Sequence, residues 1–114
     1  IVAEVATLGE DPGQDAERCA GQAARLFGRY VSVLLELAGE EPGDVEVPAD
    51  PVAASYVVAA GLQVDLADKQ RLLLAPTAAE RLRAASALLR RELAIMDRLQ
   101  AAGPAPMAGP FSLN

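Results

Sequence analysis

The fold is decided by residues 77–100, which read TAAERLRAASALLRRELAIMDRLQ. Thr77 and Glu80, three residues apart, match a capping box, in which each side chain pairs with a backbone N–H that the first helical turn leaves free. Ala, Leu, Arg and Glu, which favour helices, fill most of the stretch, and the pair at 103–104, Gly-Pro, ends it. The pattern predicts one helix over 77–100 with a length of about 35 Å.

This helix is expected to have one apolar face. Six apolar residues recur at steps of three or four, which places them on the same side of a helix. They are Leu82, Ala85, Leu89, Leu93, Met96 and Leu99. The charged residues Arg83, Arg90, Arg91, Asp97 and Arg98 mostly fall on the remaining surface. A helix of this kind needs other helices to cover it, and the rest of the chain supplies three candidates.

The first candidate helix spans 15–38 and ends at Gly39, a common C-terminal stop. Its predicted apolar face consists of Ala20, Ala23, Ala24, Phe27, Tyr30, Val31, Leu34 and Ala38. Residues 40–49, EEPGDVEVPA, are too acidic and too rich in proline for a regular element. They are therefore expected to form a loop.

The other two helices begin at aspartates. Asp50 precedes Pro51, a pair that suits an N-cap and the first helical position, so a helix is predicted over 51–60. Its sequence is apolar nearly all round, which predicts that it is the most buried element. Asp65 is expected to cap a third helix over 65–75, with Asp68 near its positive end. Pro76 separates it from the helix at 77–100.

These elements predict an all-α fold, a four-helix antiparallel bundle or array, over residues 11–102. The alternating, β-branched residues 1–8, IVAEVATL, indicate one strand. Because one strand cannot stand alone, residues 1–10 are interpreted as the last strand of a truncated β subdomain. Residues 103–114 are expected to form a flexible tail, since prolines recur there too often for a regular element.

Charge and composition exclude several classes of function. The chain has 114 residues and a net charge of −6, which argues against nucleic-acid binding. Residues 1–50 hold eleven acids and three bases, and residues 51–114 hold five acids and seven bases. Either the two halves attract each other in the fold, or the acidic surface selects partners.

The lack of a visible membrane span or signal peptide, together with the single cysteine, indicates a soluble protein of a reducing compartment. We expect this compartment to be the cytoplasm. No apolar run approaches the roughly 18 residues that a membrane span needs, and no signal peptide is visible. Cys19, the single cysteine, excludes an internal disulfide and is expected to be buried on a helix.

Side chains that could support catalysis are scarce. The chain has no histidine, the commonest general base and metal ligand. It also lacks a glycine-rich phosphate-binding motif. Lys69, its only lysine, is expected to be a solvated helix residue. The acids at 40–46 lack the ordered spacing of a calcium loop. We therefore predict no catalytic residues, no cofactor and no metal ligands.

One stretch resembles a known family. Residues 55–93, SYVVAAGLQVDLADKQRLLLAPTAAERLRAASALLRREL, are similar to the C-terminal helical part of the Lon protease N-terminal domain, the LON substrate-binding domain. The matching positions are Leu62, Asp65, Leu66, Lys69, Gln70, Leu72, Leu73, Arg81 and Leu82. The family has a β-rich subdomain followed by a helical bundle, and the resemblance extends over residues 1 to about 100. Because the last helix ends at Gly103, the chain resembles the stand-alone type, without ATPase or peptidase.

The resemblance implies a non-catalytic module that binds unfolded or partner polypeptides. Leu74 stands where the family usually has Glu, so it is either a partner contact or a minor surface leucine. Leu74, Lys69 and Gln70 are the candidate contact residues. Two alternatives stay open: a structural module for helical dimerisation or tethering, and a fragment of a full ATP-dependent serine protease. Neither nucleic acid nor a membrane is expected as a partner, and the oligomeric state is not predicted.

Overall fold

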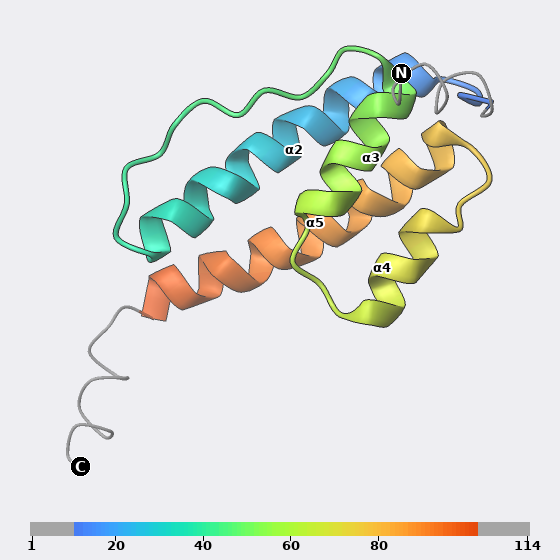
Figure 1. Ribbon diagram of the computed structural model, residues 1–114. Coiled ribbons are helices and arrows are strands. Elements are labelled where there is room, and N and C mark those ends of the chain that lie inside the picture. The colour runs from blue at the N-terminus through green and yellow to red at the C-terminus, as the bar shows by residue number, and fades with distance from the viewer. Residues whose placement is uncertain (1–10, 103–114) are drawn as a thin grey trace.

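The computed structural model describes residues 11–102, which fold into four helices without a strand (Figure 1). The helices are α2 (Ala16–Leu37), α3 (Pro51–Gly61), α4 (Leu66–Leu73) and α5 (Ala78–Ala102). The predicted all-α class with four helices is confirmed, and each helix lies within two residues of its expected bounds. The strand expected at 1–8 and the tail at 103–114 fall outside the described residues.

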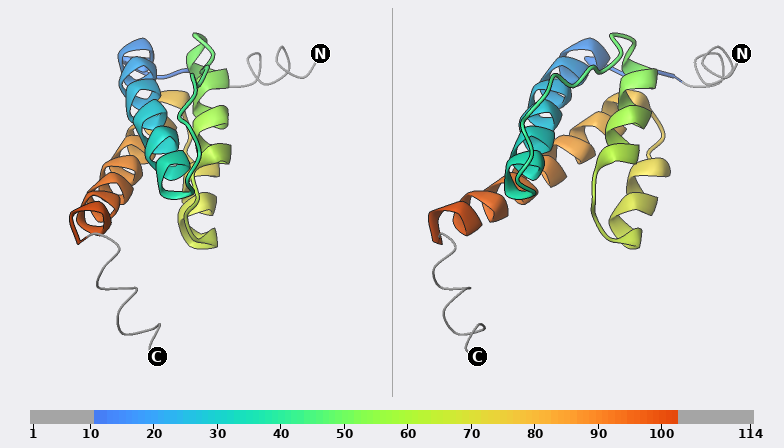
Figure 2. Two further views of the ribbon diagram at one scale, coloured as in Figure 1. Left: turned by 90° about the vertical axis from the view of Figure 1, so that its left-hand side faces the viewer. Right: turned by 60° about the vertical axis from the view of Figure 1, so that its left-hand side comes forward.

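The long helices α2 and α5 lie side by side and run in the same direction, so the antiparallel order predicted for the bundle does not hold for this pair (Figures 1 and 2). α3 packs across both of them, and α4 runs antiparallel to α3 on the side away from α2. The shared direction of α2 and α5 depends on residues 38–50, which run back along α2 to the end where it began (Figure 2). Val45 and Val47 of this connection pack against the core.

Three predicted N-caps are confirmed by hydrogen bonds. The carboxylate of Asp50 accepts from the N–H of Ala53 at 2.9 Å, and Asp65 accepts from the N–H of Asp68 at 2.9 Å. The hydroxyl oxygen of Thr77 accepts from the N–H of Glu80 at 3.1 Å. The second half of the capping box differs from expectation. The Glu80 carboxylate accepts from the Thr77 hydroxyl at 3.3 Å.

The first turn of α5 finds its remaining partners in the segment that leads into α2. The N–H of Ala79 donates to the carbonyl of Pro12 at 2.7 Å, and the N–H of Ala78 donates to that of Asp11 at 3.4 Å. Gly13 has a positive φ of 88° and lies so close to Thr77 that a Cβ would stand 2.8 Å from its hydroxyl oxygen. Only glycine fits this crossing without strain.

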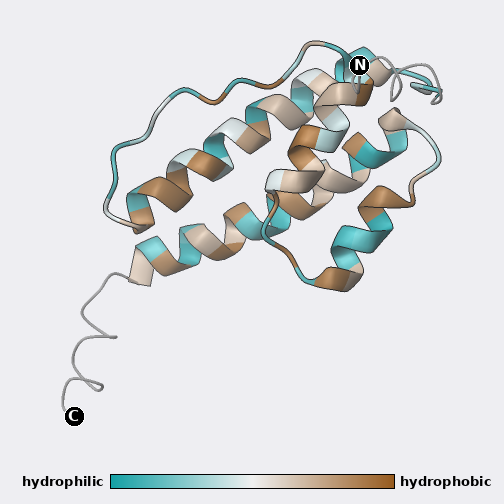
Figure 3. Cartoon of the chain, in the orientation of Figure 1, coloured by the Kyte–Doolittle hydropathy of each residue, from teal (hydrophilic) through white to brown (hydrophobic). Residues whose placement is uncertain are grey.

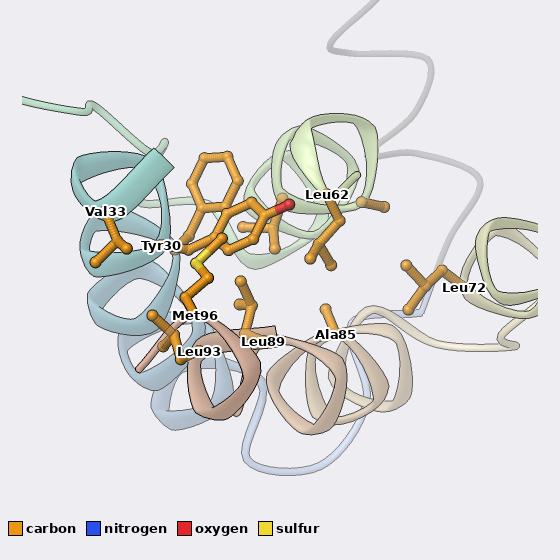
Figure 4. Packing of buried hydrophobic residues seen from close by; sticks show 11 residues of the cluster. Tyr30, Val33, Leu62, Leu72, Ala85, Leu89, Leu93 and Met96 are labelled. Carbon is orange, nitrogen blue, oxygen red and sulfur yellow. The ribbon is translucent and has the colours of Figure 1, made fainter. Parts of the chain in front are cut away.

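The core lies where α2, α3 and α5 meet (Figure 4). Leu89 and Leu82 of α5 are fully buried, and Phe27 and Tyr30 of α2 stack with ring centroids 6.3 Å apart. Of the six residues predicted on the apolar face of α5, five are buried: Leu82, Ala85, Leu89, Leu93 and Met96. The prediction for Leu99 was wrong, because α3 and α4 pack against the first half of α5 (Figure 1) and its side chain is 54% exposed.

The apolar helix α3 is less buried than its sequence predicts. Val52, Ala54 and Val58 face the core, but Tyr56 and Val57 are exposed. The reason is geometric: α2 and α5 lie on one side of α3, and little of the chain covers its outer face (Figure 2). Cys19 is buried on α2, as predicted. Among residues 11–102 no helix combines the length and the apolar composition that crossing a membrane requires.

Candidate functional site

Lys69 holds the C-terminal end of α3. Its Nζ donates to the carbonyl oxygens of Ala59, Ala60 and Leu62 at 2.7, 3.0 and 2.7 Å. These carbonyls lie at a helix end that carries partial negative charge and lacks intrahelical donors. The expectation of a freely solvated Lys69 was therefore wrong. Its charge stabilises the α3–α4 turn and is less available to a partner than predicted.

Arg81 is buried where α3, α4 and α5 meet, and only 1% of the residue is exposed. Its Nε donates to the carbonyl of Leu72 at 3.0 Å, and one Nη donates to that of Ala75 at 3.0 Å. The other Nη donates to the hydroxyl of Ser55 at 2.9 Å. The guanidinium carbon also stands 4.2 Å from the ring centroid of Tyr56, a cation–π distance.

Sequence reasoning singled out Arg81 only as a position matched by the resemblance. A signal was present, because Arg81 lies one turn before Ala85 and therefore on the core side of the helix. Because arginine is charged and is almost never fully buried unless it is paired, it was not expected in the core. The hydroxyl of Ser55 donates to the carbonyl of Val52 at 2.7 Å, the bond back to the helix backbone expected of helical serines.

Asp68 joins α4 to α5 through an ion pair with Arg91. The residue is buried, and its carboxylate accepts from Arg91 at 3.1 Å and from Arg71 at 3.1 Å. Arg91 also pairs with Glu92 at 3.1 Å. The hydrogen bonds to Asp68 and then to Glu92 raise the pKa of Arg91 above its ordinary value. Sequence analysis placed Asp68 at the helix end but missed Arg91, since the two are 23 residues apart.

The outer surface of α4 is apolar and open to solvent. Leu74 is 81% exposed, Leu66 is 72% exposed, and Leu73 is half exposed. Gln70 lies between them and is also exposed. Figure 3 shows the hydrophobic residues at both ends of α4 with hydrophilic ones between. We call Leu66, Gln70, Leu73 and Leu74 the α4 outer surface. Two of the three predicted contact residues, Leu74 and Gln70, belong to it, and Lys69 does not.

The opposite side of α4 borders a groove on α5. This groove, the α4–α5 groove, has a volume of about 220 Å³. It is lined by Asp68, Arg71, Leu72, Ala84, Ala87 and Leu88. Small-molecule and cofactor pockets usually occupy roughly 300–1,000 Å³. The groove is therefore suited to one or two side chains of a polypeptide and too small for most cofactors.

A wider hollow lies where the N-terminal ends of α2 and α3 meet the segment that caps α5. It has a volume of about 670 Å³, and three acidic residues, Asp15, Glu17 and Asp50, line it. Acidic side chains at the positive ends of helices stabilise those helices, which accounts for part of the acidic excess in residues 1–50. Within residues 11–102 no group of three or more acidic or cysteine side chains is placed to hold a metal ion.

No protein-family model matches the chain, and neither the curated proteins nor the solved structures contain a match. The similarity to the Lon N-terminal domain therefore stays a prediction based on residues 55–93. The geometry defines a small helical domain with exposed leucines on and directly after α4 and an adjoining groove.

Proposed function

We propose that this domain is a non-catalytic, cytoplasmic module that binds unfolded or partner polypeptides through the α4 outer surface. The observation that carries the proposal is the exposure of Leu66, Leu73 and Leu74 on and directly after a helix of only eight residues. Burying one such side chain contributes roughly 1.5–3 kcal/mol. A polypeptide that covered all three leucines would thus gain a substantial apolar contribution to binding.

The way in which α4 is attached supports this proposal. Only Leu72 of the apolar residues on α4 is buried. The helix is held instead by polar contacts: Lys69 to the end of α3, Arg81 to the carbonyls of Leu72 and Ala75, and Arg91 to Asp68. Because these contacts fix α4 in place, its other leucines are not needed for attachment and face outward.

The test is a binding titration with a fluorescein-labelled protein that is kept unfolded by reduction and carboxymethylation. The wild-type domain should raise its fluorescence anisotropy in a saturable manner. The double variant Leu66→Gln and Leu74→Gln should weaken the association at least tenfold. Leu37→Gln is the matched control, since Leu37 is exposed on α2 away from α4. Equal binding by all three proteins, or no binding at high micromolar concentration, would contradict the proposal.

A second candidate function, helical dimerisation, rests on a different surface. Ile95 is 44% exposed and Leu99 is 54% exposed, and the two lie one turn apart on α5. This spacing suits a seam between two helices. Sedimentation velocity over a hundredfold range of concentration decides the point. A dimer that dissociates on the change Leu99→Glu supports this candidate, and a monomer at every concentration removes it.

A further inference from the structure

We propose that the α4–α5 groove binds a short polypeptide segment in which one large apolar side chain is flanked by carboxylates. This inference rests on the proposed function, because it specifies the class of polypeptide that the domain accepts. The α4 outer surface is open and nonspecific, whereas the groove beside it combines an apolar floor with a charged rim. The two surfaces lie on opposite sides of the same helix.

The floor of the groove suits one apolar side chain. Ala84 and Ala87 contribute only methyl groups, and Leu72 and Leu88 complete the apolar lining. Small residues on a helix surface leave depth that neighbouring large residues enclose. Because the cavity of about 220 Å³ is lined mainly by apolar atoms, burial of a leucine or phenylalanine there would be favourable.

The rim of the groove favours negative charge. The Arg71 side chain lines the groove and is 75% exposed. Within residues 11–102, its one polar partner is the nearly buried carboxylate of Asp68. A guanidinium has five N–H donors, so most of those on Arg71 face solvent. Asp68 itself is already paired with Arg71 and Arg91, and Glu92 with Arg91, which leaves Arg71 as the rim group open to a new partner.

The distribution of charge over the chain points the same way. Residues 51–114 hold seven bases and five acids, whereas the acidic excess lies in residues 1–50. Both α4 and α5 belong to the basic half, so an acidic segment approaching the groove meets less repulsion there than along residues 40–50, which hold five acids and no base. Carboxylates of such a segment would pair with Arg71 in the bidentate geometry that guanidinium allows.

The experiment uses three short synthetic peptides and the isotope-labelled full chain. The first peptide carries one leucine between two pairs of glutamates, the second replaces the glutamates by lysines, and the third replaces the leucine by alanine. Backbone amide shifts are followed by NMR. The first peptide should give saturable shifts at Ala84, Ala87 and Leu88, and each of the other two should bind at least tenfold more weakly.

Protein variants separate the groove from a general charge effect. Arg71→Glu should weaken binding of the acidic peptide at least tenfold. Arg25→Glu makes the same charge change at an exposed site on α2 and should alter the affinity less than twofold. Ala87→Met, which fills the floor without changing charge, should also weaken binding at least tenfold. Helix content measured by circular dichroism verifies that each variant is folded.

Several outcomes would overturn the inference. One is a loss of acidic-peptide affinity with Arg25→Glu equal to that with Arg71→Glu. The others are binding of the lysine peptide as tight as that of the glutamate peptide, and amide shifts that fall on α2 instead of α5. The result is separable from the proposed function. If unfolded protein binds through the α4 outer surface and the Arg71 and Ala87 variants leave the peptide affinity unchanged, the groove inference fails alone. If the acidic peptide binds in the groove and unfolded protein does not bind, the function proposed for the outer surface fails.

Discussion

At the scale of single residues, the buried guanidinium of Arg81 organises the half of the domain that contains α4. From its position on α5, it donates to the hydroxyl of Ser55 on α3, to the carbonyl of Leu72 on α4, and to the carbonyl of Ala75 just after α4. A lysine in its place would offer a single charged point and no planar fork. The geometry of Arg81 thus determines where α4 lies, and through α4 it positions both candidate binding surfaces.

Replacing Arg81 by methionine should lower the free energy of unfolding by about 2–4 kcal/mol, because buried carbonyl groups lose their donors. Urea denaturation followed by circular dichroism measures the change. Arg83→Met is the control, since Arg83 is exposed and donates to the carbonyl of Gln14. A loss below about 1 kcal/mol for Arg81→Met would show that water replaces the guanidinium.

Tyr30 makes stability depend on alkaline pH. Burial raises the pKa of its hydroxyl above the ordinary value of 10.0, although the hydrogen bond from the N–H of Gln63 lowers it. The folded protein therefore keeps the phenolic proton at a pH where the unfolded chain has lost it. This contribution is fully present below about pH 10 and is lost as pH rises through the raised pKa.

The free energy of unfolding should consequently fall more steeply for the wild type than for Tyr30→Phe as pH rises above about 10. Urea denaturation at several pH values gives both slopes. Parallel slopes for the wild type and Tyr30→Phe would refute this account of the Tyr30 pKa.

At the scale of elements, close approach between α3 and α2 depends on a glycine. A Cβ on Gly61, the last residue of α3, would stand 2.8 Å from the Cε1 atom of Phe27 on α2. The same atom on Gly28, within α2, would meet nothing within 4 Å. Of these two helical glycines, packing therefore requires Gly61 to lack a side chain but places no such demand on Gly28.

Alanine substitutions at Gly61 and Gly28 should change the stability of the domain in opposite directions. Gly61→Ala should destabilise the domain by about 1–3 kcal/mol, because the aromatic ring has to shift in a packed core. Gly28→Ala should stabilise it by up to about 1 kcal/mol, since alanine favours a helix interior. Thermal unfolding of the two variants measures both effects. A stabilising Gly61→Ala would mean that Phe27 moves aside at little cost.

The helix bounds and caps could be predicted because their signals are local. Asp50, Asp65 and Thr77 each bond a backbone N–H three residues away, so the sequence window contains both partners. The contacts that build the candidate site are not local. Lys69 reaches back to the carbonyl of Ala59, and Arg91 reaches Asp68 on another helix. Only the arrangement of the helices in space brings those groups together.

At the scale of the whole molecule, the core is built mainly from α2, α3 and α5, and α4 adds Leu72 to it. The first half of α5 is covered by several helices, whereas its last turns lean on α2 alone (Figure 1). Helical periodicity predicted that Leu89 and Leu99 lie on the same face of α5 and are both buried. Their spacing along the helix fits that face, but only Leu89 is covered by other helices. Periodicity does not contain the lengths over which partner helices extend, and for that reason the burial of Leu99 could not be predicted.

Leu89→Ala should therefore cost about 2–5 kcal/mol, the range for a fully buried leucine. Leu99→Ala should cost less than about 1 kcal/mol, because its side chain is already half in solvent. Chemical denaturation of the two variants gives the comparison. Similar losses would indicate that the exposed end of α5 is covered in solution, as the dimerisation candidate requires.

The return of residues 38–50 along α2 sets a minimum length for this topology. With 22 residues at about 1.5 Å each, α2 is roughly 33 Å long, and an extended chain advances about 3.3 Å per residue. About ten residues are thus needed to carry the chain back before α3 starts. If a deletion left fewer than about ten residues in this connection, α3 would have to begin near the C-terminal end of α2. The helices α3, α4 and α5 would then have to pack on α2 in the reverse direction.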